Sequence, residues 1–204
     1  MLLAINRDHP EPRKIQRAAK ILGDGGVIAY PTDTVYGLGC ALGEKQAIDR
    51  LYQLKGMPKD HPLAIICPDL SDIAKYAVVE NAVYRVLKHF LPGPYCFILM
   101  ATREVPKIML TKQKTVGIRV PNHAITIALV RELGRPLIST TAGRSGQDPL
   151  VDPWEIEQEF SGLDLVIDQG DAGGSVPTTV VDLSQGDVRI VREGAGPVDE
   201  LVSD

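Results

Sequence analysis

Hydrophobic positions along the chain switch repeatedly between helical and extended spacing. Ile15, Ala18, Ala19 and Leu22 follow the i, i+3, i+4, i+7 spacing of an amphipathic helix, and two glycines at 25 and 26 end the pattern. Short apolar runs bounded by turn residues predict strands. The same patterns predict further helices over residues 47–54, 81–91 and 122–133 and one that begins at Asp152, and strands over residues 27–30, 63–67, 95–100, 116–120, 136–140, 163–168, 178–183 and 188–192.

The order of these elements predicts the fold class. Strand–helix–strand units favour parallel neighbours, whereas Ser184–Asp187 joins the last two predicted strands as a hairpin, which makes them antiparallel. No long polar linker, repeat or low-complexity tract interrupts residues 1–204. We therefore predict an α/β fold, a single domain with an open mixed sheet and flanking helices.

Composition limits the class of protein and its compartment. Hydrophobic residues make up 44% and charged residues 24% of the 204 residues, which is the balance of an ordinary globular protein. The longest apolar run, Tyr95–Ala101, is far shorter than the roughly 18 residues of a membrane span. Cys40, Cys67 and Cys96 are widely spaced within apolar stretches. We predict a cytoplasmic protein with reduced core cysteines and no membrane segment.

Charge is distributed unevenly along the chain. Residues 1–144 hold 20 basic and 12 acidic side chains, whereas residues 145–204 hold 2 and 14. Residues 103–119 alone carry five basic side chains and a single acid. Such an excess favours either a basic face that binds an anionic ligand or nucleic acid, or two ordinarily solvated faces, and both interpretations stay open.

Familiar nucleotide and hydrolase motifs are absent from the sequence. Gly37–Gly39 follows a predicted strand, but Leu42 stands where the last glycine of G-x-G-x-x-G would fall, and no Walker sequence occurs. Gly143–Gly146 misses the G-x-S-x-G elbow by one residue. The four histidines lack the spacing of zinc ligands. We therefore predict no Rossmann, P-loop or serine hydrolase site and no metal held by the protein.

Four polar loops follow the predicted strands and helices. They are Tyr30–Gly39, Leu54–Leu63, Ser139–Gly146, and Pro177–Asp182 together with Val191–Gly194. Their hydroxyls, backbone N–H groups and basic side chains suit a small polar or phosphate-bearing ligand. Gly37 and Gly39 are interpreted as sites where the backbone approaches that ligand closely. Each loop alone is also compatible with an ordinary surface turn.

Taken together and in order, these loops resemble the YrdC/YciO family, whose members include the threonylcarbamoyl-AMP synthases of tRNA modification. The likeness extends from the first helix to residues 192–194. The shared motifs are Pro31-Thr-Asp-Thr-Val-Tyr-Gly-Leu-Gly39, Leu54-Lys-Gly56, Pro62-Leu63, Gly93-Pro94, Ile118-Arg-Val-Pro121, Leu137-Ile-Ser-Thr140 and Pro177-Thr-Thr-Val180. The resemblance implies a twisted open sheet around a concave, positively charged cavity.

The resemblance also implies a reaction. L-threonine, bicarbonate and ATP would combine in the cavity to give threonylcarbamoyl-AMP and pyrophosphate, with Mg²⁺ accompanying the ATP, for modification of the adenosine beside the anticodon. Members of the family also bind tRNA or double-stranded RNA. Because the chain ends at Asp204, we expect one YrdC-like domain over residues 1–204 without the extra C-terminal domain of larger members.

Site residues follow from the resemblance position by position. Thr32, Arg119, Ser139 and Thr178 match positions around threonine, and the Arg119 guanidinium suits its carboxylate. Lys55, Thr141 and Arg192 match positions around ATP, with Lys55 as the catalytic cation that stabilises charge on the phosphates.

Two positions depart from the synthase pattern. Met57 replaces the arginine of a Lys-x-Arg pair, and Gly143 replaces the asparagine of Ser-x-Asn. Both departures resemble the YciO branch, so we expect weakened synthase turnover that Met57→Arg with Gly143→Asn would restore. The alternative function is an RNA-binding or regulatory module with weak or no synthase activity.

Overall fold

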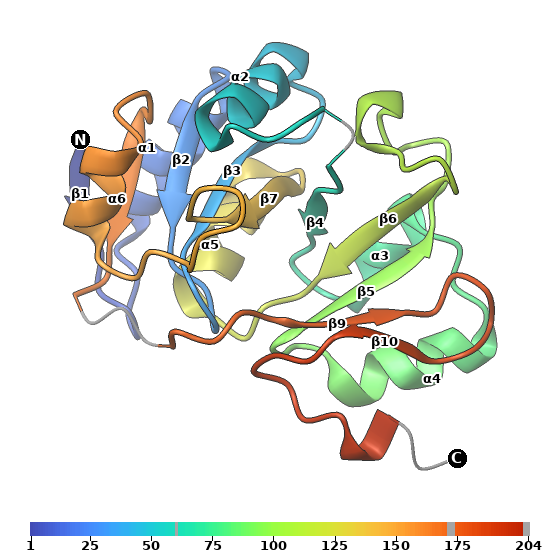
Figure 1. Cartoon of the computed structure of the whole chain (residues 1–204). Coiled ribbons are helices and arrows are strands. Elements are labelled where there is room, and N and C mark those ends of the chain that lie inside the picture. Colours follow the sequence, from blue (N-terminus) through green and yellow to red (C-terminus); the bar gives the residue numbers. More distant parts are fainter. Residues whose placement is uncertain (60, 171–173, 202–204) are drawn as a thin grey trace.

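One ten-stranded sheet forms the centre of the protein in the computed structural model, which describes residues 1–59, 61–170 and 174–201 (Figure 1). The strands are β1 (Leu2–Ala4), β2 (Val27–Tyr30), β3 (Gly37–Ala41), β4 (Ala64–Ile66), β5 (Tyr95–Met100), β6 (Thr115–Arg119), β7 (Leu137–Thr141), β8 (Leu165–Asp168), β9 (Thr179–Asp182) and β10 (Arg189–Arg192). The helices are α1 (Pro12–Gly23), α2 (Lys45–Lys55), α3 (Leu70–Tyr76), α4 (Asn81–Phe90), α5 (Ala124–Leu133) and α6 (Pro153–Glu159), with short 3₁₀ turns at Lys107–Met109 and Asp199–Leu201.

The sheet is mixed, as predicted. Its order is β1-β8-β2-β3-β7-β4-β6-β5-β9-β10. Strand β8 pairs in parallel with β1 and β2, and β4–β6 and β5–β9 are also parallel, whereas the other neighbours are antiparallel. The predicted hairpin is the antiparallel pair β9–β10. Figure 1 shows β2 and β3 crossing the direction of β5 and β6 steeply, which is the twist of a large open sheet.

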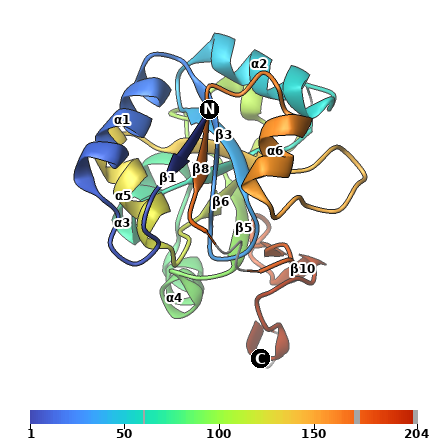
Figure 2. The same cartoon turned by 90° about the vertical axis from the view of Figure 1, so that its left-hand side faces the viewer.

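Helices cover both faces of the sheet near its β1 edge. Figure 2 shows α1 and α6 on opposite sides of β1 and β8. Ile15 of α1 and Leu129 of α5 share one apolar core with Ile28, whereas Ile48 of α2 and Ile156 of α6 belong to the core of the other face. Strands β2 and β8 are therefore buried on both faces, which explains their continuous apolar sequences.

Further along the sheet, only one face of β5 and β6 packs against helices. Ile73 of α3 and Leu87 of α4 lie in the same core as Phe97 and Ile118. The side chains that alternate with Phe97 and Ile118 point to the opposite face, because strand residues alternate with a period of two. That face is the one on which the functional site is built.

Strand β3 corrects the sequence analysis, which placed Gly37 and Gly39 in a ligand-binding loop. Both glycines pair in register with β2 and β7. A Cβ at Gly37 would lie 3.0 Å from Tyr30 Cζ, and one at Gly39 would lie 2.9 Å from Tyr30 Cε1. The Tyr30 ring therefore fills the space above the two glycines. Glycine-rich strands lack the β-branched pattern on which strand prediction depends.

Two further elements, β1 and α3, also escaped the sequence patterns because both are short. Helix α3 begins after Asp69, whose carboxylate accepts hydrogen bonds from the N–H groups of Ser71 and Asp72. Among the described residues, no helix is long and apolar enough to cross a membrane.

Candidate functional site

A cavity of about 590 Å³ opens on the face of the sheet that the helices leave free; we call it the strand cavity. It extends from β7 and β4 across β6 and β5 to β9 and β10. The lining residues are His61, Pro62, Leu63, Ala64, Cys96, Ile98, Met109, Thr111, Gln113, Thr115, Val116, Gly117, Arg119, Ser139, Thr140, Thr141, Thr178, Val180, Asp182, Arg189, Val191 and Arg192. Five residues predicted from the sequence are thus brought together on its wall: Arg119, Ser139, Thr141, Thr178 and Arg192.

Strand periodicity explains why these residues meet. Thr115, Gly117 and Arg119 alternate along β6, and Ser139 and Thr141 alternate along β7, so each set faces one side of the sheet. Gly117 places no side chain on the cavity floor, which leaves room for a ligand between the two sets.

Arg119 is the buried cation of the strand cavity, with 8% of its surface exposed. Its Nη2 donates to Asp33 Oδ1 at 3.0 Å and to Thr34 Oγ1 at 3.3 Å. Its Nε is buried and has no hydrogen-bond partner in the described part of the chain. A buried guanidinium N–H without an acceptor is costly, so this donor points to a ligand that supplies the acceptor.

Ser139 presents a second buried donor to the same cavity. Its Oγ accepts a hydrogen bond from the hydroxyl of Tyr30 at 2.5 Å. No described residue accepts the proton of Ser139 itself, although the side chain is 4% exposed. Arg119 and Ser139 line the same cavity, and each keeps one donor for which no described residue is the acceptor.

Thr178 and Arg192 form the far wall of the strand cavity. Arg192 lies on the edge strand β10, and its Nε and Nη2 donate to the carbonyl of Thr178 at 3.2 and 2.8 Å. The neighbouring Thr179 hydroxyl accepts from the N–H groups of Gly194 and Gly196 at 3.0 Å each. These contacts hold the chain after β10 against the start of β9.

Thr32 lies outside the cavity wall. Its hydroxyl donates to the carbonyl of Val35 at 2.7 Å and lies 3.1 Å from Thr34 Oγ1. Thr32 is therefore connected to Arg119 through Thr34, which contacts the guanidinium directly. The tight turn between β2 and β3 thus presents Asp33 and Thr34. The sequence predicted a polar contact from the hydroxyl of Thr34 and no role for Asp33.

Lys55, the last residue of α2, also lies outside the wall and holds the end of β7, where Thr141 lies. Its Nζ donates to the carbonyls of Thr141, at 2.6 Å, and Gly143. Burial lowers the pKa of Lys55 to about 8. The structure therefore places Lys55 beside Thr141 and leaves one of its three N–H donors for a ligand.

The two departures from the synthase pattern occupy tight places. Met57 is 6% exposed and packs in the core with Tyr52 and Leu63. A Cβ at Gly143 would lie 2.9 Å from the carbonyl oxygen of Asp148, and Gly143 has no positive φ. An arginine at 57 and an asparagine at 143 therefore do not fit this packing without movement.

Acidic groups in the strand cavity do not form a metal site. In the described part of the chain no three His, Cys, Asp or Glu side chains gather. Although burial acts to raise the pKa of Asp182, hydrogen bonds from Ser184 and Arg189 lower it below its usual range. Asp182 is thereby occupied as the partner of Arg189, at 2.8 Å.

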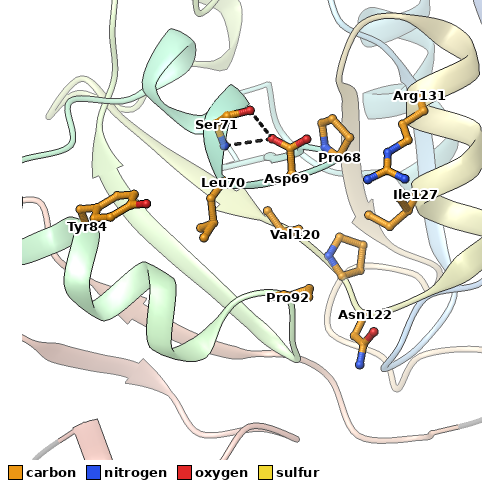
Figure 3. A pocket seen from close by; sticks show the side chains of 11 residues that line it. Pro68, Asp69, Leu70, Ser71, Tyr84, Pro92, Val120, Asn122, Ile127 and Arg131 are labelled. Carbon is orange, nitrogen blue, oxygen red and sulfur yellow. Dashed lines mark hydrogen bonds between the residues drawn. The ribbon is translucent and has the colours of Figure 1, made fainter.

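A second hollow of about 540 Å³ lies where α3, α4 and α5 meet; we call it the helix hollow (Figure 3). Apolar side chains such as Leu70 and Val120 line much of it, and Figure 3 shows Asp69 and Arg131 at its rim. Asp69 Oδ1 accepts from the N–H and hydroxyl of Ser71 at 2.9 and 2.5 Å. None of the predicted site residues lines the helix hollow, so the strand cavity is the candidate site.

Comparison with solved structures agrees with this fold. The crystal structure of YciO from Escherichia coli matches with a TM-score of 0.94 and 40% sequence identity, covering 99% of each chain. The crystal structure of Pyrococcus abyssi Sua5 complexed with L-threonine matches with a TM-score of 0.92 and 28% identity, covering 98% of this chain and 59% of that one.

Sequence comparison leads to the same group of proteins. A threonylcarbamoyl-AMP synthase of Chromobacterium violaceum is 37% identical over 184 residues, which cover 90% of this chain and 94% of that protein. YciO of Escherichia coli strain K12 is 41% identical over 197 residues, with 95% of both chains covered. Residues 20–194 match the family model Sua5_yciO_yrdC, described as telomere recombination. The chain therefore belongs to the Sua5/YciO/YrdC family.

Proposed function

We propose that this protein is a threonylcarbamoyl-AMP synthase-like enzyme, which binds L-threonine in the strand cavity and joins it to bicarbonate and the AMP part of ATP. The observation that carries the proposal is the buried Nε of Arg119, which has no partner in the described part of the chain. Arg119 lines the same cavity as Ser139 and Thr178. A titratable or nucleophilic group is not required, because the amine of threonine is itself the nucleophile.

The threonine carboxylate is the natural acceptor for the open donors. Arg119 would donate from Nε and Ser139 from its hydroxyl, and Asp33 holds the guanidinium in place at 3.0 Å. A hydrogen bond to a charged group contributes about 1.5–3 kcal/mol, and planar guanidinium–carboxylate pairs are the strongest of these. Thr178 would supply a further polar contact at the far wall, while Thr32 would act through Thr34.

ATP would bind where Thr141, Lys55 and Arg192 lie. Threonine and bicarbonate form a carbamate and release water; a carbamate oxygen then attacks the α-phosphorus, and the bond to pyrophosphate breaks. The cations Lys55 and Arg192 would stabilise the charge that accumulates on the phosphates. Because no metal-binding cluster occurs among the described residues, Mg²⁺ is expected to arrive on the phosphates of ATP.

The direct test is pyrophosphate release from ATP in the presence of Mg²⁺, L-threonine and bicarbonate. We expect release that depends on both co-substrates and that disappears in the Arg119→Gln variant. The Arg131→Gln variant, which removes an exposed arginine of the helix hollow, should keep the activity of the unchanged protein. Release that does not depend on threonine would contradict the proposal.

Binding of double-stranded RNA or tRNA is the second candidate function, and a basic segment favours it. Arg103, Lys107, Lys112 and Lys114 are all exposed and form no ion pair with any described residue. The same segment reaches the strand cavity at Met109. Phosphate contacts of this kind weaken steeply with salt and show little base preference.

A filter-binding titration at several salt concentrations tests the RNA candidate. We expect duplex RNA binding that weakens as salt rises and that Lys112→Glu with Lys114→Glu weakens further. Lys20→Glu, a charge reversal on α1, serves as the matched control because Lys20 lies outside the segment and pairs with Asp24 at 2.6 Å. Absence of binding above roughly 50 mM salt would exclude this function.

A further inference from the structure

Tyr30 is a buried polar side chain that the proposed reaction does not use. It is the last residue of β2 and is 0% exposed. Its side chain passes over the neighbouring strand β3, and its hydroxyl donates to Ser139 Oγ on β7 at 2.5 Å. A tyrosine thus connects the covered part of the sheet to the wall of the strand cavity.

The sequence of β3 makes this crossing possible. Gly37 pairs with Tyr30, and Gly39 pairs with Ser139. A Cβ at Gly37 would lie 3.1 Å from the Tyr30 hydroxyl and 3.2 Å from Ser139 Oγ, and one at Gly39 would lie 2.9 Å from the ring. A larger residue at Gly37 would press on the ring, and one at Gly39 would collide with the ring and also with the carbonyl oxygen of Ile138, at 2.6 Å. Glycine weakens a strand interior, so the two glycines indicate that the path itself matters.

The hydrogen bond fixes where the proton of Ser139 points. Burial raises the pKa of Tyr30 to about 12, so its phenol stays protonated at neutral pH and remains the donor. A serine hydroxyl carries one proton, and an oxygen that accepts from Tyr30 must direct its own proton elsewhere. No described residue accepts that proton, and Ser139 lines the strand cavity.

We propose that Tyr30 is a positioning residue that holds the Ser139 hydroxyl as a donor aimed into the strand cavity, toward the carboxylate of a bound amino acid. The proposal rests on the proposed function for the identity of the ligand. It assigns a role to the β3 glycines as well: they clear the path by which Tyr30 reaches Ser139. Without the phenol, the Ser139 hydroxyl would be free to rotate and to donate a hydrogen bond to a neighbouring carbonyl.

A double-mutant cycle in threonine affinity tests the proposal, with L-threonine titrated calorimetrically into four proteins: unchanged, Tyr30→Phe, Ser139→Ala and the double variant. We expect Tyr30→Phe to weaken binding about fivefold and Ser139→Ala to weaken it about tenfold, which are the effects of one hydrogen bond. The double variant should bind like Ser139→Ala alone, because Tyr30 acts only through Ser139. Independent, multiplying effects of the two changes would overturn the proposal.

Tyr36→Phe is the matched control. Tyr36 is also fully buried, and burial raises its pKa to about 12, but its hydroxyl accepts from the N–H of Gln169 and does not contact Ser139. We expect less than a twofold change in threonine affinity. A weakening equal to that of Tyr30→Phe would show that loss of any buried phenol disturbs the site, and would overturn the proposal.

Crystal structures of the unchanged protein and of Tyr30→Phe test the same inference without a ligand. We expect a single Ser139 rotamer in the unchanged protein and a changed or divided rotamer in the variant. An unaltered rotamer would overturn the positioning role. If the unchanged protein binds no threonine, the proposed function fails, whereas the rotamer comparison still decides the role of Tyr30.

Discussion

The strand cavity and the helix hollow have similar volumes, about 590 and 540 Å³, but differ in the state of their polar groups. In the strand cavity, Arg119 and Ser139 are buried, and each keeps a donor for which no described residue provides an acceptor. In the helix hollow, Asp69 and Arg131 are exposed, and Asp69 caps α3.

Volume alone therefore does not identify a functional site in this protein. An arginine in water keeps its hydration whether or not a ligand is present, whereas a buried N–H without an acceptor costs about 1–3 kcal/mol. The free-energy cost of such a donor at Arg119 is offset when a ligand supplies the acceptor. Under the proposed function the strand cavity would bind an anion, whereas the helix hollow is a gap beside the start of α3, where Asp69 is already used as the N-cap.

Removal of one arginine from each of the two hollows should have very different effects. Arg119→Gln should weaken threonine binding about 100-fold, because the charged hydrogen bond from Nε is lost, at a cost of about 1.5–3 kcal/mol. Arg131→Gln should leave the affinity within about twofold, since its side chain stands in solvent. Isothermal titration calorimetry of both variants measures the difference, and equal effects would contradict the contrast between the two places.

A second prediction concerns Met57, a core residue close to the polar loop that follows α2. Met57→Arg would place a cation among the core residues Tyr52 and Leu63. We expect a loss of about 3 kcal/mol or more in the free energy of unfolding, measured in urea, instead of restored synthase turnover. Met57→Leu should cost less than about 1.5 kcal/mol. A stable and faster Met57→Arg enzyme would refute this description of the packing.

The smallest predicted effect is a pH dependence caused by Lys55, which contacts the backbone of the cavity residue Thr141. Burial lowers the pKa of Lys55 to about 8, so its ammonium loses its proton between pH 7 and 9, and ATP affinity should fall about tenfold over that interval. Folding stability should change in the opposite direction. The unfolded chain, whose lysine pKa is about 10.5, binds more protons above pH 8, so the free energy of unfolding rises with pH there.

The variants Lys59→Gln and Lys55→Gln distinguish the titration of Lys55 from other effects of high pH on the protein. Lys59 is exposed and pairs with Asp49 at 2.5 Å, so its removal should leave both pH trends intact. Lys55→Gln should abolish both. Persistence of the ATP trend without Lys55 would assign it to another group.

Elements with strong periodicity were predictable from the sequence. The spacing of Ile15 and Leu22 predicted α1, and the polar turn at Ser184–Asp187 predicted the β9–β10 hairpin; both are confirmed. Strand β3 was not predictable, because Gly37 and Gly39 match a loop pattern as well as a strand, and only the tertiary position of Tyr30 decides between the two.

The candidate site was predictable in its residue types and less so in its contacts. Motif order singled out Arg119 and Ser139, and the structure places both on one wall. The order of the motifs could not reveal that Asp33 holds the guanidinium of Arg119. Nor could it reveal that Lys55 donates two hydrogen bonds to the backbone carbonyls of Thr141 and Gly143. These contacts join segments far apart in the sequence, and their geometry depends on the sheet order.

The most direct test of the central claim compares L-threonine with L-threoninol, which keeps the amine and side chain but replaces the carboxylate with a hydroxymethyl group. If the open donors of Arg119 and Ser139 exist to bind a carboxylate, calorimetry should show binding of L-threonine and at least 100-fold weaker binding of L-threoninol, about 3 kcal/mol in free energy. Equal affinities for the two compounds, or binding of neither, would contradict the account.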